Sequence, residues 1–159
     1  MRERQTADTD ACIAIGGKMG PTVTAMPDGT KKTSWYSGRI PGVFEEILLS
    51  LEARKPVYLC GAFGGATAAA VELLQGRIPR EFSWDYQKQA PHSEALRGLL
   101  AEHGMAWKDY PEMAAFCAAV GVNGVSRVNG LSDEENRELF YCREVPRLIE
   151  LLLIGLARA

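Results

Sequence analysis

The sequence lacks three features that would point to common functions. No apolar run reaches the roughly 18 residues of a membrane-spanning helix. Its 18 lysines and arginines are outnumbered by 20 acidic residues, and a net charge of −2 does not favour binding to nucleic acid. The four cysteines lie far apart without a CxxC pair, which argues against a disulfide framework or a zinc site. We therefore expect a cytoplasmic protein with reduced cysteines, and neither a membrane, a nucleic acid nor a metal as partner.

The first half of the chain shows an α/β alternation. With 159 residues, 47% of them hydrophobic, the chain is long enough for one domain with a core. Residues 11–15 and 56–60 are short and rich in β-forming residues, and residues 40–55 between them have apolar positions at helical spacing. A glycine-rich turn and a further helix follow in residues 61–76. This order predicts a parallel βαβ unit.

The remainder indicates a β-hairpin insertion and a helical C-terminal half. Residues 22–36 alternate around Pro-Asp-Gly, a hairpin signal that we interpret as a lid over the strand ends. The predicted fold class is a Rossmann-like open parallel sheet with flanking helices, of which only two core strands are evident. In the second half the patterns predict helices over 92–104, 110–121 and 145–159, Asn-Gly turns at 123–124 and 129–130, and a capping box over 132–135.

Two glycine-bearing turns follow the predicted strands. Gly16 and Gly17 precede Lys18, but no Ser or Thr comes next and no GxxxxGK frame is present, so the turn is not an NTPase phosphate loop. The second turn is GAFGG, residues 61–65, directly before a helix whose amides could hold an anion. Both turns lie at the carboxyl ends of parallel strands, where open α/β sheets bind ligands. The alternative for the first turn is a tight exit from the strand with an exposed lysine, and the alternative for the second is packing of the helix on the strand.

Charged and aromatic residues elsewhere extend this candidate site. Glu45 and Glu46 begin a helix, where the helix dipole alone explains one carboxylate, while the other could bind sugar hydroxyls or act as a general base. In the hairpin region, cations could meet phosphate and an aromatic ring could stack on a base. The alternative is that this region is a solvent-exposed loop that one buried aromatic side chain holds against the domain. The hairpin residues in question are Lys31, Lys32, Arg39, Trp35 and Tyr36.

The order Arg2, TDACIAIGGK, PGVFEE and KPVYLCGAFGGA resembles the central motifs of the SLOG superfamily. This group includes the lonely-guy phosphoribohydrolases, and the closer resemblance is to SLOG domains associated with TIR or sirtuin-type modules in bacterial defence. The PGGxGTxxE pattern of the enzymes is interrupted here by the hairpin insertion. The family's first strand, glycine turn and helix do not precede Met1, which suggests a partial domain or part of a longer chain.

The resemblance implies a non-catalytic sensor or regulatory domain for a nucleotide derived from NAD, such as a cyclic ADP-ribose, without a cofactor. Arg2 and Lys18 would contact phosphates, and Glu45 or Glu46 would bind ribose hydroxyls. The alternative is a nucleoside 5′-monophosphate phosphoribohydrolase with Arg2 and Glu46 as catalytic residues; a structural domain with a vestigial site is the third reading. The expected ligand-binding residues are Arg2, Gly16, Gly17, Lys18, Gly42, Glu45, Glu46, Gly61, Gly64 and Gly65.

Two apolar segments indicate association with another polypeptide. A sheet that starts at residues 11–15 leaves one strand edge without a partner. The helix over 146–156 is apolar nearly all round and has more leucine than a monomer can usually bury. We therefore expect a homo-oligomer or a fused effector domain.

Overall fold

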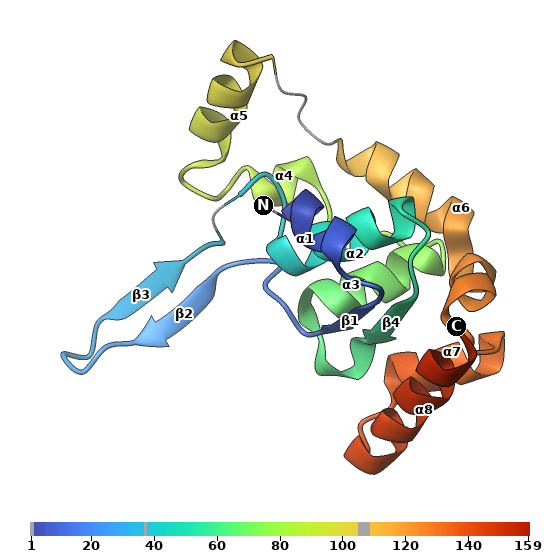
Figure 1. Cartoon of the computed structure of the whole chain (residues 1–159). Helices are drawn as coiled ribbons and strands as arrows, with labels where there is room; N and C mark the ends of the chain where they lie inside the picture. Colours follow the sequence, from blue (N-terminus) through green and yellow to red (C-terminus); the bar gives the residue numbers. More distant parts are fainter. Residues whose placement is uncertain (1, 37, 105–108) are drawn as a thin grey trace.

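A two-stranded parallel sheet forms the centre of the domain (Figure 1). The computed structural model describes residues 2–36, 38–104 and 109–159. Strand β1 (Cys12–Ile15) pairs in parallel with β4 (Val57–Cys60), in a register from Cys12 opposite Val57 to Ile15 opposite Cys60. Helix α2 (Gly42–Glu52) makes the crossover between them. The predicted βαβ unit is confirmed, with its helix ending a little earlier than expected.

In the part of the chain that the structure describes, no helix is both long and apolar enough to cross a membrane.

The remaining elements follow the predicted alternation closely. The elements are α1 (Arg2–Asp8), β2 (Thr22–Ala25), β3 (Lys31–Ser34), the short 3₁₀ helix η1 (Gly61–Phe63), α3 (Gly65–Leu74), α4 (Trp84–Gln87), α5 (Ser93–Glu102), α6 (Tyr110–Asn129), α7 (Asp133–Tyr141) and α8 (Val145–Arg158).

Helices cover both faces of β4, so the domain has three layers. Every residue of β4 is buried, and successive side chains of a strand point to opposite faces. Val57 and Leu59 pack into the main core with α2, α3 and α6. Tyr58 and Cys60 pack into a second cluster with Leu131 and residues of α7 and α8. This double cover explains why β4 is apolar throughout.

Strand β1 is covered on one face only. Ala14 is buried in the main core, whereas Ile13 and Ile15 on the opposite face are 51% and 54% exposed. Among the described residues, β4 is the only strand that pairs with β1. The predicted unpaired edge is therefore present, and it lies beside an uncovered apolar face.

The predicted hairpin forms, but it does not act as a lid. Strands β2 and β3 pair antiparallel, are almost fully exposed, and project away from the body of the domain (Figure 1). The residues that follow anchor the hairpin: the Trp35 ring packs edge-on against Tyr86, and the Tyr36 hydroxyl donates to Gln87 Oε1 at 2.9 Å. The alternative reading, an exposed excursion with an aromatic anchor, is the one that the structure confirms.

The C-terminal half is helical as predicted, with one correction. Helix α6 continues through residues 123–124, so the Asn-Gly turn expected there is wrong. The interruption lies two residues earlier, at Gly121, whose φ of 59° and ψ of −179° bend the helix. The second expected turn is present, because Gly130 ends α6 with a φ of 72°. Ser132 and Glu135 form the predicted capping box at the start of α7.

Candidate functional site

The Gly16–Gly17 turn is joined to the start of α3 by backbone hydrogen bonds. The amide of Ala66 donates to the Gly17 carbonyl at 3.0 Å, and the amide of Thr67 donates to the Gly16 carbonyl at 2.9 Å. The Thr67 hydroxyl also donates to the Gly16 carbonyl, at 3.0 Å. Positive φ angles of 62° and 90° let the two glycines turn these carbonyls toward α3. Two amides of the first turn of α3 are therefore already satisfied by the protein.

The glycines of the second turn differ from one another. At Gly65 a Cβ atom would lie only 1.9 Å from the Gly17 carbonyl oxygen, so the contact between the two turns requires a glycine there. Gly64 has a φ of 77° and caps α3. Gly61 is buried, and a Cβ there would lie 2.8 Å from the Phe140 carbonyl oxygen, so its role in the structure is packing against α7.

Two arginines and two glutamates form a polar cluster at the first turn of α2. Arg2 donates from Nη1 to Glu45 Oε2 at 2.9 Å and from Nε to Glu46 Oε1 at 3.3 Å. Arg39 donates from Nη2 to Glu45 Oε1 at 3.1 Å. Both oxygens of the buried Glu45 side chain are thus engaged, whereas the Glu46 side chain is 39% exposed. No pattern in the sequence indicated that Arg39 pairs with Glu45.

Gly42 and its neighbour Val43 connect this cluster with the glycine turn. A Cβ at Gly42 would lie 2.4 Å from Arg2 Nη2, so the guanidinium packs directly against the backbone at the start of α2. A Cβ at Gly17 would lie 2.7 Å from the Cβ of Val43. The structure therefore brings the cluster, the Gly16–Gly17 turn and the start of α3 to one end of the sheet.

Lys18 lies at the rim of a cavity of about 510 Å³ beside the glycine turn. Its ammonium group is exposed and donates to the Ser34 hydroxyl of β3 at 3.3 Å. The cavity is also lined by Glu72, Glu81 and Tyr86, so it contains one cation and two carboxylates. Lys31 and Lys32, which were also expected near phosphate, lie on the exposed hairpin.

The cysteines contribute no reactive group to this site. All four are free thiols. Burial raises the pKa of Cys12 and Cys60, and it raises the pKa of Cys117 to about 12. Within the described ranges, His, Cys, Asp and Glu side chains do not gather into a group of three that could hold a metal. The functional groups at this end are thus two arginines, one lysine, the two carboxylates of the polar cluster, the two carboxylates that line the cavity, and backbone groups.

Comparison with known proteins gives one match. A family model described as SLOG cluster2 matches residues 1–139 of the chain. The matched region includes the Gly16–Gly17 turn, the polar cluster and the start of α3. No curated protein matches the chain, and no solved structure matches it.

Proposed function

The chain belongs to the SLOG cluster2 family, and we propose that it is a non-catalytic domain that binds a nucleotide-derived ligand. The observation that carries this proposal is the pairing of Arg2 with Glu45 and Glu46. In a hydrolase, Arg2 would orient a phosphate and Glu46 would carry the acid–base chemistry. Here the guanidinium is divided between two carboxylates, which supports binding over hydrolysis.

The ligand class that we propose is a nucleotide derived from NAD, such as a cyclic ADP-ribose, sensed in bacterial defence. Lys18 would contact a phosphate, because its ammonium group is exposed beside the glycine turn. Glu46 would bind ribose hydroxyls, since both oxygens of Glu45 are engaged. The amides of Ala66 and Thr67 donate to the glycine carbonyls, which leaves the Gly65 amide as the group of this turn for a second phosphate.

Calorimetric titration with cyclic ADP-ribose isomers tests this proposal. We expect Lys18→Ala to weaken binding about ten- to hundredfold, because a charge-assisted contact contributes roughly 1.5–3 kcal/mol. Lys31→Ala is the matched control, since Lys31 lies on the exposed hairpin. Equal losses in the two variants would place the anion elsewhere.

The second candidate function is phosphoribohydrolase activity of the lonely-guy type, which the exposure of the Glu46 carboxylate favours, since that side chain is 39% exposed. The protein would be incubated with AMP and with cytokinin nucleotides, and free base would be measured. Base released at an enzymatic rate, and lost in Glu46→Gln, would establish the hydrolase and exclude the non-catalytic reading.

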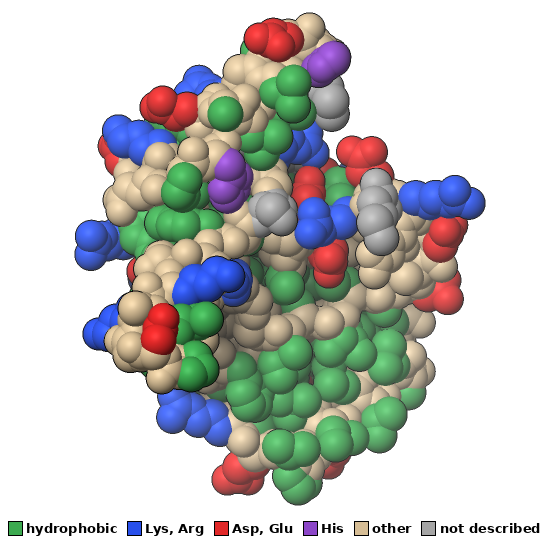
Figure 2. Space-filling view, turned by 90° about the vertical axis from the view of Figure 1, so that its left-hand side faces the viewer, with side chains coloured by type: hydrophobic (Ala, Val, Ile, Leu, Met, Phe, Trp, Pro, Cys, Tyr) green, Lys and Arg blue, Asp and Glu red, His purple; other side chains and the backbone are tan. Residues whose placement is uncertain are grey.

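We also propose that two copies associate through the uncovered face beside β1. Figure 2 shows hydrophobic side chains gathered over the lower part of this face of the molecule. Two β1 strands related by a two-fold axis would run antiparallel and pair their free edges. Six side chains that are each about half exposed offer on the order of 600 Å², compared with roughly 800 Å² per partner in a standard interface. They are Ile13, Ile15, Phe63, Ile149, Leu153 and Leu156.

Light scattering at micromolar concentration tests the association. We expect Leu153→Lys to convert dimers to monomers, because a charge would replace an apolar contact. Leu99→Lys is the control, since Leu99 is similarly exposed but lies on α5. A wild-type monomer, with or without cyclic ADP-ribose, would contradict the association.

A further inference from the structure

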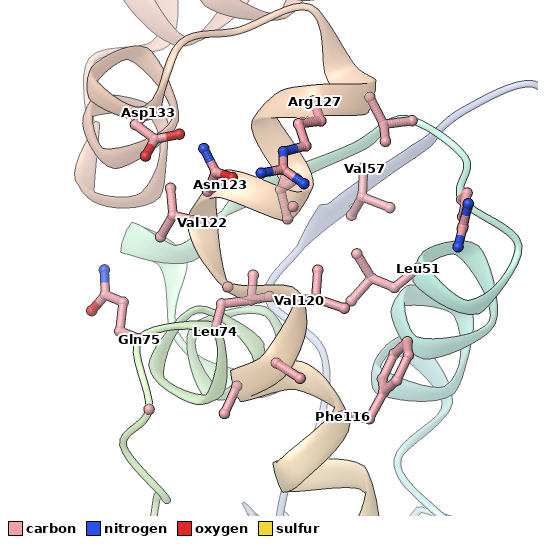
Figure 3. Close-up of a pocket in the computed structure, with 18 of the residues that line it drawn as sticks. Leu51, Val57, Leu74, Gln75, Phe116, Val120, Val122, Asn123, Arg127 and Asp133 are labelled. Atoms are coloured by element: carbon pink, nitrogen blue, oxygen red, sulfur yellow. The ribbon is translucent and has the colours of Figure 1, made fainter.

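A second and larger cavity lies at the opposite end of β4 from the glycine turn. Its volume is about 1280 Å³, and it is lined by the ends of α2 and α3, by Val57 at the start of β4, and by α6 and α7. Figure 3 shows Leu51 from α2, Leu74 from α3 and Arg127 from α6 around this space. None of the residues expected from the sequence to bind a ligand lines it.

Positive charge is concentrated in this cavity. Five cationic and two acidic side chains line it, in a protein whose net charge is −2. Lys55 donates to backbone carbonyls of α1 and the residue after it, and Arg137 lies 3.8 Å from Asp133. Arg54 and Arg127 form no ion pair or side-chain hydrogen bond with another described residue. Two guanidiniums are therefore available to an anionic ligand.

The bend in α6 lies at the wall of this cavity. Gly121 has a non-helical φ of 59° and ψ of −179°, and the helical segment 122–129 follows it. Val122, Asn123 and Gly124 at this start all line the cavity. The positive end of a helix dipole favours an anion at such a position.

Hydrophobic side chains also line the cavity. Leu51, Leu74, Phe116, Val120 and Val122 contribute hydrophobic surface between the cations (Figure 3). An inorganic anion would leave this surface in contact with water, whereas a ligand with an apolar body would cover it. A ligand with both an anionic group and an apolar body would therefore match the cations and the hydrophobic side chains of this cavity.

We propose that this cavity is a second binding site, specific for an amphipathic organic anion: one phosphate, sulfonate or carboxylate group joined to an apolar ring system or acyl body. Arg127 binds the anionic group near the start of the segment 122–129, with Arg54 at the rim. The apolar body lies against Leu51, Leu74 and Phe116. This site is separate from the nucleotide site, so a ligand here can regulate the domain without competing for the glycine turn.

Two fluorescent probes that differ in one charged group test the proposal. Anilinonaphthalene sulfonate carries an aromatic body and an anion, and phenylnaphthylamine has the same body without the sulfonate. We expect the sulfonate to bind the wild-type protein at least tenfold more tightly than the neutral probe, and to weaken as salt is added. Equal affinity of both probes would overturn the proposal and indicate binding to the apolar face beside β1.

Arginine variants locate the site. We expect Arg127→Gln to reduce sulfonate affinity about ten- to hundredfold and to leave the neutral probe unchanged. Arg143→Gln is the matched control, because Arg143 is exposed outside the cavity. Circular dichroism establishes that each variant is folded. Equal sulfonate affinity in the two variants would overturn the assignment of the site, whereas Lys18→Ala, which tests only the nucleotide site, should not change it.

Discussion

The two ends of β4 are built in different ways. At the carboxyl end, backbone amides of α3 donate to the carbonyls of Gly16 and Gly17. The two glycine turns approach so closely that a side chain at Gly65 would clash with the Gly17 carbonyl oxygen. At the amino end, the buried side-chain amide of Asn129 donates to the Val57 carbonyl at 2.8 Å and to Asn136 Oδ1 at 2.9 Å. One end is therefore held by backbone contacts that need glycine, and the other by side chains from elements that are far apart in the sequence.

The two ends also differ in charge. The cavity beside the glycine turn has one cation and two carboxylates, whereas the cavity at the amino end has five cations and two acids. An anion beside the glycine turn must therefore depend on Lys18 and on a few amides. At the other end, the side chains alone supply the excess of positive charge. Motifs that identify the first end contain no information about the second.

The largest effect on stability is expected from Gly65→Ala. The new Cβ would clash with the Gly17 carbonyl oxygen at a position where φ is +65°. Overpacking costs about 1–3 kcal/mol and a left-handed backbone costs about 1–2 kcal/mol, so we expect a loss of about 2–5 kcal/mol. Urea unfolding followed by circular dichroism measures this loss.

Gly16→Ala is the matched control for this variant. Gly16 has a φ of +62°, but a Cβ there would meet no atom within 4 Å. Its free energy of unfolding should fall only by the cost of a left-handed backbone at alanine, about 1–2 kcal/mol. If both variants lose the same free energy, the close approach of the two turns does not stabilise the carboxyl end.

An intermediate effect is expected at the amino end. Asn129 and Asn136 are both fully buried, and Asn136→Ala removes one acceptor for the Asn129 amide and one donor to the Ser132 carbonyl. Buried groups left unsatisfied cost about 1–3 kcal/mol, which urea unfolding would detect. Asn123→Ala, at an exposed position of α6, should change stability by less than about 0.5 kcal/mol. A loss in Asn136→Ala as small as that of the control would show that water replaces these bonds.

The difference between the ends explains what the sequence could predict. The βαβ unit, the hairpin and the glycine turns depend on local patterns, and the structure confirms each of them. Arg2 and the α2 carboxylates are more than 40 residues apart; the family resemblance assigned them to one site but did not predict the ion pairs between them. The helix predicted over 110–121 ends where the bend at Gly121 lies, but the Asn123-Gly124 signal hid the continuation of α6 beyond it.

The cavity at the amino end could not be predicted at all. Arg54 follows the end of α2, Gln75 follows the end of α3 and Arg127 lies in α6, and no motif spacing relates them. Their proximity depends on tertiary packing of α2, α3 and α6 around β4. Side-chain sites of this kind require coordinates, whereas glycine-dependent backbone sites can be recognised from short stretches of sequence.

The smallest effect, and a gain in stability, is expected from Arg54→Gly at the rim of the larger cavity. Arg54 is the non-glycine residue with positive φ among those described, at 54°. Its amide donates to the Leu51 carbonyl and the next amide donates to the Ser50 carbonyl, the Schellman arrangement in which glycine is usual. The left-handed backbone costs an arginine about 1–2 kcal/mol, and the extra freedom of glycine in the unfolded chain offsets about 0.4–1 kcal/mol.

We therefore expect Arg54→Gly to raise the free energy of unfolding by about 0.5–1 kcal/mol, seen as a higher urea midpoint at an unchanged slope. Ala53→Gly is the control, because Ala53 has an ordinary φ of −78° and should lose about 0.5–1 kcal/mol. The same Arg54→Gly variant should bind the sulfonate probe more weakly. Greater stability with weaker binding would mean that the arginine is kept at the rim for a ligand, against the preference of the backbone. A loss of stability would instead assign Arg54 a structural role.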